Sequence, residues 1–271
     1  MIANGADWKV TPLAMFTAYF DASGDSHSQI ALAVAGFVSH AEAWIEWEKE
    51  WLSRLRQDGL EYFHRKDLYG WERWKRERLI DDLSAIIKTH VSSKAGVVVI
   101  NSDLQAQLSV KARKKWRVDA YSLAARTIAK EMRIWASGWG GKCPELVFEE
   151  GDNGKGDLTY LLENDGYPSP IFKPKKSYVH RKSGLFMQAA APLQAADLLA
   201  YELFYKARAI RQSKEASRSF SRIHPVIDKI PGQCEIITPD HLRFLEHGLE
   251  QMNSLILVPN IEIKNIRTAG V

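Results

Sequence analysis

Three places in the sequence carry carboxylates that a solvated surface does not explain well. Asp21 ends an apolar, strand-like run just before a Ser-Gly turn, and Glu149 and Glu150 end another such run. Asp197 lies inside the segment LQAADLLAYE. Ligands commonly bind at the carboxyl ends of strands in α/β proteins, where two of these places lie. Carboxylates that cluster without a set of Cys and His ligands indicate a hard divalent cation, Mg²⁺ or Mn²⁺.

Asp197 is the most informative of these carboxylates. On a helix, the residues that share its face are all apolar or aromatic: Leu193, Ala200, Tyr201 and Phe204. A carboxylate on such a face loses hydration, which is costly unless the group is paired or binds a cation. The sequence therefore predicts a partner for Asp197, which is a metal ion, an Arg or Lys side chain, or a set of hydrogen-bond donors.

The chemistry expected of such carboxylates is phosphodiester hydrolysis. Two divalent ions about 4 Å apart can position a water, lower its pKa and stabilise the leaving oxygen. We expect a two-ion site held by Asp21, Glu149 and Asp197, with Glu150 as an additional ligand. Each carboxylate also has a structural explanation, because Asp21 could form a turn, the glutamates could be exposed, and Asp197 could be a buried acid satisfied by donors.

A histidine adds a candidate acid or base. His64 follows an aromatic pair and precedes Arg65 and Lys66. As a catalytic residue it would transfer a proton or orient the substrate beside the metal ions. The alternative is a surface or core histidine that takes no part in chemistry.

Basic residues gather at 111–117, 173–182 and 206–222. Such clusters suit a phosphate backbone, although a single cluster is more often a solvated helix face. The third cluster opposes six Lys and Arg residues to one acid, Glu215, and continues the helix that carries Asp197. We therefore predict that it contacts nucleic acid, through Lys206, Arg208, Arg211, Lys214 and Arg218.

Alternating strands and helices must position these residues. Apolar runs predict strands at 14–21, 30–38, 60–64, 95–101, 145–150 and 171–178, and a short one at 255–258. Helical periodicity predicts helices at 71–90, 115–136, 157–164 and 192–211. A further helix is expected to begin at Ser39, which has capping-box spacing to Glu42. The turn ASGDS at 22–26 makes the first two strands a hairpin.

This order predicts one α/β domain over residues 1–271, with a mixed β-sheet flanked by helices. A helical insertion is expected at roughly 40–92 and a basic C-terminal extension at roughly 206–271. Trp44, Trp47 and Trp51 have helical spacing, so we expect them to pack in the core rather than to stack on bases.

Composition and charge narrow the class of protein. The 271 residues are 45% hydrophobic and 26% charged, which is typical of a globular domain. A net charge of +4 permits a polyanionic partner without demanding one. Cys143 and Cys234 make neither a disulfide framework nor a zinc site, and neither a signal peptide nor a membrane span is recognisable. We expect free thiols, no membrane association and a cytoplasmic location.

Three segments resemble the signatures of the domain-of-unknown-function 3800 family, which has a ribonuclease H-like fold. They are YFDASGDS at 19–26, VFEEGDNGKG at 147–156 and LQAADLLAYE at 193–202, and FHRKDL at 63–68 is similar to the family's His-containing segment. The third motif is matched in full, whereas Ala22 replaces a Glu of the first motif and Glu149 replaces an Asp of the second. The resemblance implies a ribonuclease H-like sheet with a metal-dependent, nuclease-like active site built from Asp21, Glu149 and Asp197.

Two functions follow from these motifs. The first is a metal-dependent phosphodiesterase that acts on RNA or DNA. The second is a catalytically inactive ribonuclease H-like module that binds nucleic acid or a protein partner, which the residues at Ala22 and Glu149 motivate. A small-molecule phosphohydrolase is a third alternative, because such carboxylates alone do not specify the length of the substrate.

Overall fold

A mixed β-sheet forms the centre of the protein, for which a computed structural model describes residues 16–24, 30–139, 142–213 and 223–256. Within these ranges the sheet has six strands in the order β5-β4-β1-β2-β3-β8. Their bounds are β1 (Phe16–Gly24), β2 (Ala31–His40), β3 (Ser93–Ile100), β4 (Glu145–Glu149), β5 (Ile171–Lys173) and β8 (Gly232–Ile237). β2 runs antiparallel to β1 and β3, β4 runs parallel to β1 and β5, and β8 runs parallel to β3.

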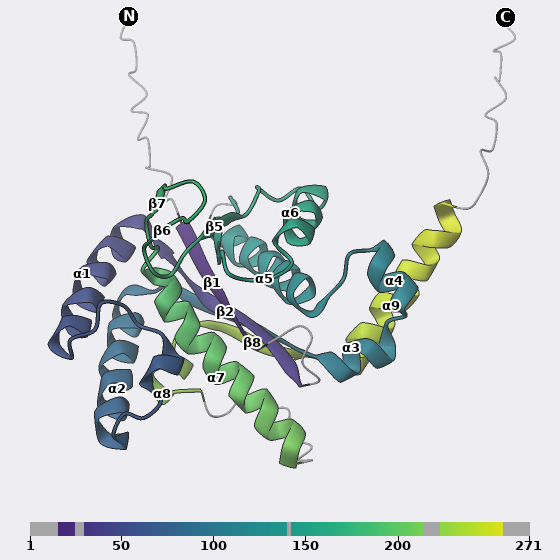
Figure 1. Ribbon diagram of the computed structural model, residues 1–271. Helices are drawn as coiled ribbons and strands as arrows, with labels where there is room; N and C mark the ends of the chain where they lie inside the picture. Colours follow the sequence, from purple (N-terminus) through teal and green to yellow (C-terminus); the bar gives the residue numbers. More distant parts are fainter. Residues whose placement is uncertain (1–15, 25–29, 140–141, 214–222, 257–271) are drawn as a thin grey trace, which may run out of the picture.

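Helices flank this sheet and connect its strands (Figure 1). Between β2 and β3, where the sequence predicts a helical insertion, the chain forms α1 (Ala41–Gln57), the 3₁₀ helix η1 (Arg65–Leu68) and α2 (Arg73–His90). The later helices are α3 (Asn101–Gln107), α4 (Val110–Lys115), α5 (Ala120–Ser137), α6 (Lys155–Asn164), α7 (Pro192–Ser213), α8 (Pro225–Asp228) and α9 (Pro239–Ile256). The predicted α/β class with a mixed sheet and flanking helices is confirmed, and the arrangement is consistent with a ribonuclease H-like fold.

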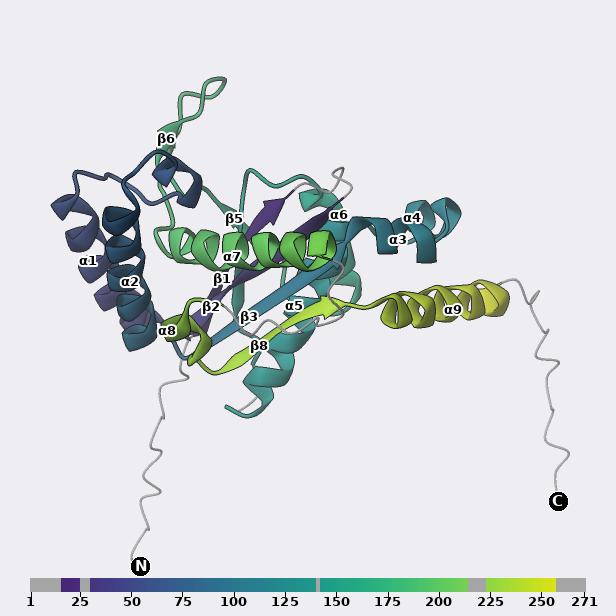
Figure 2. The same cartoon turned by 90° about the horizontal axis from the view of Figure 1, so that it is seen from below.

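A second, two-stranded sheet leaves the body of the molecule. β6 (Tyr178–Val179) and β7 (Phe186–Met187) pair antiparallel, and Figure 2 shows this hairpin projecting outward. Among the helices of the described ranges, none combines the length and the apolar character that crossing a bilayer requires.

The interior strand β2 is buried on both faces, which explains its almost wholly apolar sequence. Ala31, Ala33, Ala35 and Phe37 face the cluster that includes residues of α1, α2 and α7. Leu32, Val34 and Val38 face a second cluster, to which α5 and α6 contribute. The two faces therefore bury two cores, and α7 packs on the opposite side of the sheet from α5 (Figure 1).

Small residues bring α7 close to the sheet. A Cβ built on Gly96 of β3 would lie 2.4 Å from Leu203 Cδ1 of α7, so a larger side chain would force the two elements apart. Trp44, Trp47 and Trp51 of α1 are buried on the same face, which confirms that they pack in the core.

Several boundaries differ from those the sequence predicts. β1 continues to Gly24, because its antiparallel register with β2 extends past Asp21, which pairs with Ala35. Asp21 is therefore an interior strand residue and not the end of a strand. Ser39 belongs to β2 and donates its hydroxyl to the His90 carbonyl at 2.6 Å, so it does not cap the following helix. Residues 60–64 form no strand.

The second half of the chain also corrects the predictions. α5 begins at Ala120 and not at 115, because Asp119 and Ser122 form a capping box there. The strand predicted at 171–178 is interrupted and divides between β5 and the start of β6. β8 is a strand that periodicity did not single out, and residues 255–256 end the helix α9 rather than form a strand. Residues 257–258 lie outside the described part of the chain.

Candidate functional site

Asp21 lies at the centre of the sheet, in the middle of β1. It is 1% exposed. Its Oδ1 accepts the Ala22 backbone N–H at 2.8 Å, and its Oδ2 accepts the Lys175 ammonium at 2.6 Å. Charge-assisted hydrogen bonds of this kind hold a buried carboxylate in a fixed orientation. A strand position of this type is rigid, which suits a residue that must hold a ligand.

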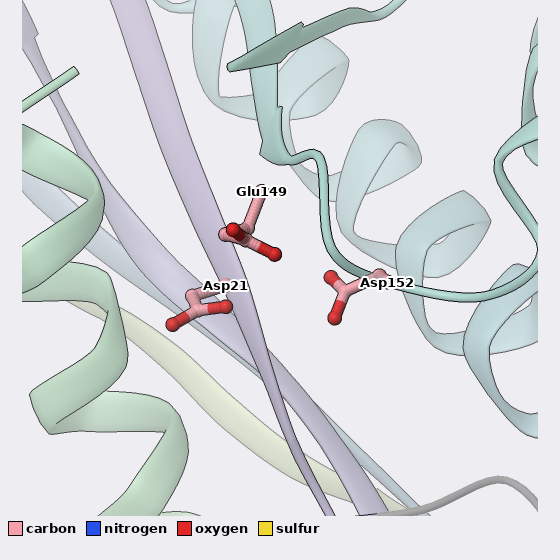
Figure 3. Close-up of side chains that lie close together, drawn as sticks. All are labelled: Asp21, Glu149 and Asp152. Carbon is pink, nitrogen blue, oxygen red and sulfur yellow. The ribbon is translucent and has the colours of Figure 1, made fainter. Parts of the chain in front are cut away.

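Glu149 and Asp152 join Asp21 to form an acidic trio. The parallel register of β1 and β4 pairs Phe20 with Phe148, so the residues that follow each of them come side by side. Asp152 reaches the same place from the loop after β4, and carboxylate oxygens of the three residues lie within 4.8 Å of one another (Figure 3). Of the residues that the structure describes, these are the ones grouped closely enough to share a metal ion.

The trio fits a hard divalent cation. Asp152 Oδ2 is buried and has no hydrogen-bond partner within the described ranges. Burial raises the pKa of Asp152 to about 7, and the charge of Glu149 adds to this, while Lys175 and Lys155 oppose it. Burial also raises the pKa of Asp21 well above its ordinary value, against the opposing charge of Lys175. A bound cation would stabilise the ionised form of these buried, clustered carboxylates. Mg²⁺ and Mn²⁺ prefer oxygen ligands of this kind.

A buried tyrosine borders the same acidic space. Tyr121 of α5 is 1% exposed, and its hydroxyl has no partner among the described residues. Burial raises the pKa of Tyr121 well above its ordinary value, and the charges of Asp152, Asp21 and Glu149 raise it further. Tyr121 therefore stays protonated and is a hydrogen-bond donor toward anything bound among the carboxylates.

Asp197 of α7 also lies near Asp21, and its carboxylate is bound by protein groups. Its Oδ1 accepts the Lys175 ammonium at 3.1 Å, and its Oδ2 accepts the Arg65 backbone N–H at 2.7 Å. The side chain is 10% exposed. Of the three kinds of partner that the sequence leaves open for Asp197, the structure supplies a lysine and a backbone donor.

Lys175 connects the two aspartates. Burial lowers the pKa of this lysine, but the charges of Asp21 and Asp197 and their hydrogen bonds raise it above its ordinary value. It is therefore an ammonium ion. The sequence places Lys175 only in a basic stretch at 173–182, and the need of a buried Asp197 for a cation was the one signal that could have pointed to it.

Gln194 is a second residue that the sequence did not single out. It is 2% exposed. Its Oε1 accepts the Trp51 indole N–H at 3.0 Å and the Phe63 backbone N–H at 2.8 Å, and its Nε2 donates to the Lys175 carbonyl at 3.0 Å. One amide thus holds α1, the segment before η1 and the backbone of Lys175 together, which explains the Gln three residues before Asp197.

His64 lies beside Asp197 at the edge of the site. Its Nε2 is 3.6 Å from Asp197 Oδ1, and its Nδ1 is 3.3 Å from Asp67 Oδ1. The side chain is 26% exposed. A histidine here reaches both solvent and the carboxylate, so it remains a candidate for proton transfer.

Glu150 does not join the acidic trio. Its carboxylate accepts a hydrogen bond from the Tyr178 hydroxyl, and its carbonyl accepts one from Lys155. Successive residues of an extended chain point to opposite sides, so Glu149 and Glu150 diverge at the end of β4. Asp152 takes the additional position that the sequence assigns to Glu150, and its place in the loop GDNGKGD was the available signal.

The basic segment predicted to contact nucleic acid is described only as far as the end of α7. The Arg208 guanidinium lies 5.9 Å from the centre of the Tyr205 ring, Arg211 donates to Ser102 Oγ at 3.1 Å, and Lys206 is half-buried. Lys214 and Arg218 lie outside the described residues.

Comparison with known proteins adds no relative. No protein-family model matches the chain, and a search of curated proteins finds no match. The resemblance to the domain-of-unknown-function 3800 family therefore stays a prediction.

Proposed function

We propose that this protein is a divalent-metal-dependent, nuclease-like phosphodiesterase that acts on RNA or DNA. The observation that carries the proposal is the convergence of Asp21, Glu149 and Asp152 from two adjacent parallel strands and the loop that follows. These residues would hold Mg²⁺ or Mn²⁺. Such an ion, when bound, lowers the pKa of a water and stabilises the leaving oxygen of a phosphodiester. The three segments that resemble signatures of the domain-of-unknown-function 3800 family support the same function.

The protein groups around the trio have separable roles. The Arg65 backbone N–H holds Asp197, which accepts the Lys175 ammonium on one side, and Asp21 accepts it on the other. His64 is placed at the exposed margin, where a proton could be passed between solvent and a reacting oxygen. The buried walls made by β1 and α7 keep these charges in a region of low polarity, where each contact has more effect than in water.

Basic and aromatic groups beside the site support a nucleic-acid substrate. Between Asp165 and Asp197 the chain has no Asp or Glu but has the cations Lys173, Lys175, Lys176, Arg181 and Lys182. This stretch includes the projecting hairpin, on which Val179, Leu185 and Phe186 are between 60% and 68% exposed. Cations interleaved with exposed apolar side chains suit a phosphate backbone and its bases.

Arginine and aromatic side chains also gather on α7 and on the segment around η1. Arg65 lies over the Tyr201 ring at 4.8 Å, and Tyr69, Tyr201 and Tyr205 hydrogen bond through their hydroxyls. With Arg208 on Tyr205, α7 presents arginine and aromatic planes next to Asp197. A reducing cytoplasm is the compartment we propose, since Cys143 and Cys234 are free thiols.

One observation favours the inactive module as an alternative. The Lys175 ammonium already balances part of the charge of Asp21 and Asp197 without any metal ion. A site whose charge is neutralised in this way would need no metal ion. The protein would then bind nucleic acid on the same basic surface without cleaving it.

The test is a cleavage assay on labelled single-stranded and duplex DNA and RNA and on hybrids, with Mg²⁺, with Mn²⁺ and with chelator. We expect metal-dependent cleavage that falls about 100-fold or more in Asp21→Asn and in Glu149→Gln. Glu145→Gln is the matched control, because Glu145 is an exposed acid at the opposite end of the same strand, β4. Cleavage by Asp21→Asn equal to wild type would contradict the proposal. Binding without cleavage under every ion would favour the inactive module.

A further inference from the structure

Lys175 occupies the space between Asp21 and Asp197, where a second metal ion of a two-ion site would be expected. Its Nζ is 2.6 Å from Asp21 Oδ2 and 3.1 Å from Asp197 Oδ1. A divalent ion would have to lie about 2.1 Å from the same oxygens. The ammonium and an ion cannot share that position, because both would need the same lone pairs and they carry like charges.

The lysine is held at this place by its backbone as well as by its side chain. The buried Gln194 donates to the Lys175 carbonyl at 3.0 Å and is itself fixed by Trp51 and Phe63. The preceding carbonyl, that of Pro174, accepts the Ala190 N–H at 2.8 Å. Hydrogen bonds therefore hold the backbone at and before Lys175. A surface lysine lacks such support, and its side chain loses conformational entropy when it is held in one position.

One donor of the ammonium remains for a ligand. A lysine ammonium has three N–H groups, and the described residues accept two of them, one at Asp21 and one at Asp197. The side chain is 20% exposed, so the group is reachable from outside the protein core. One N–H of the ammonium is therefore left for an oxygen of a bound ligand.

We propose that Lys175 is a built-in second cation, so that the site uses one divalent ion, at Asp21, Glu149 and Asp152, together with the Lys175 ammonium between Asp21 and Asp197. Its remaining N–H would donate to a non-bridging oxygen of the phosphodiester, which makes Lys175 a catalytic residue. This role rests on the phosphodiesterase function proposed above and replaces the two-ion arrangement expected from the carboxylates with one ion and one lysine.

The decisive measurement is the number of Mn²⁺ ions bound, by titration calorimetry and by electron paramagnetic resonance of the free ion. We expect one ion in wild type and in Lys175→Arg, which keeps the charge. We expect two in Lys175→Met, since the gap between Asp21 and Asp197 is then open to an ion. Adding Asp197→Asn to Lys175→Met should remove the second ion. Lys88→Met is the matched control, because Lys88 is an exposed lysine on α2 that lies outside the three basic clusters.

The outcomes separate this inference from the proposed function. Two ions in wild type, or one ion in Lys175→Met with wild-type circular dichroism, would overturn the role of Lys175 while leaving a metal-dependent enzyme. No ion bound by wild type would overturn the metal-dependent function itself. In cleavage assays Lys175→Met should lose about 100-fold in kcat, and Lys88→Met should keep the wild-type kcat. Equal kcat in the two variants would again overturn the catalytic role.

Discussion

At the scale of single residues, burial decides what each carboxylate needs. Asp21 and Asp197 share a lysine, and Asp197 also receives a backbone donor. Asp152 is the least compensated of the group, because its Oδ2 is buried and has no partner among the described residues. An acid in this position opposes folding when it ionises, and this cost is what a bound cation would relieve.

This cost gives a pH dependence for the metal-free protein. The pKa of Asp152 is about 7 in the folded protein, above its ordinary value of 3.8, so the folded state holds the proton more tightly than the unfolded chain does. The stability contributed by Asp152 is therefore unchanged below pH 4, falls as the pH rises toward 7, and is constant above it. In chelator, Asp152→Asn should gain on the order of 1–3 kcal/mol over wild type between pH 4 and pH 8.

Urea unfolding at several pH values measures this gain. Glu145→Gln, an exposed change on the same strand, should differ from wild type by the same amount at every pH. If the difference in unfolding free energy between Asp152→Asn and wild type were also the same at every pH, the Asp152 carboxyl would titrate normally in the folded protein, and the prediction would be wrong.

At the scale of elements, two kinds of structure meet at the site. β1 and β4 are rigid and parallel, and they set Asp21 beside Glu149. The β6–β7 hairpin leaves this sheet. β6 starts at Tyr178, two residues after Lys176, and the hairpin projects from the body of the molecule (Figure 2). Its Tyr178 bonds Glu150, next to Glu149, so the hairpin is tied to the strand that carries a proposed metal ligand.

The hairpin is therefore expected to hold the substrate backbone. Arg181→Glu with Lys182→Glu should weaken nucleic-acid binding about tenfold near physiological salt and reduce the salt slope by about 2. Binding is measured by fluorescence anisotropy in an Asp21→Asn background, so that cleavage does not interfere.

The control for the hairpin makes the same charge change elsewhere. Lys111→Glu with Lys114→Glu makes the same charge change on the basic helix α4, which both views place away from the hairpin (Figures 1 and 2). This pair should change the affinity much less than the hairpin pair does. Equal weakening would show that only the net charge of the protein matters.

At the scale of the whole molecule, two cores lie on opposite faces of one sheet and hold the elements that carry Asp21, Glu149 and Asp197. The far edge of that sheet depends on a buried lysine. Lys94 of β3 is 5% exposed and donates to the carbonyls of Ile227, Asp228 and Ile230 at 3.1, 2.7 and 2.6 Å. These carbonyls end α8 just before β8, so one ammonium attaches the last helix-strand unit to the sheet.

Removal of this ammonium should destabilise the fold. Lys94→Met leaves buried carbonyls without donors and should lower the free energy of unfolding by roughly 2–3 kcal/mol, measured by urea denaturation. Lys229→Met, at an exposed position in the same turn, should change it by less than about 0.5 kcal/mol. Equal effects of the two changes would mean that the hydrogen bonds of Lys94 do not stabilise the fold more than an exposed lysine does.

Local pattern determined much of this protein. Apolar runs placed most of the strands, helical spacing placed the tryptophans in the core, and the apolar face around Asp197 showed that this acid needs a partner. These conclusions hold because burial follows from periodicity along a few neighbouring residues. The identities of Asp21, Glu149 and Asp197 as chemically interesting carboxylates came from the same local reasoning and from the motifs.

Only the tertiary structure decided which groups meet. Lys175 is 154 residues from Asp21 and 22 residues from Asp197, and nothing local distinguishes it from Lys173 or Lys176. The choice of Asp152 over Glu150 depends on the parallel register of β4 and on the loop after it. A sequence pattern states that a buried charge must be compensated, whereas strand register and loop path, which are set by contacts far apart in the chain, select the residue that compensates it.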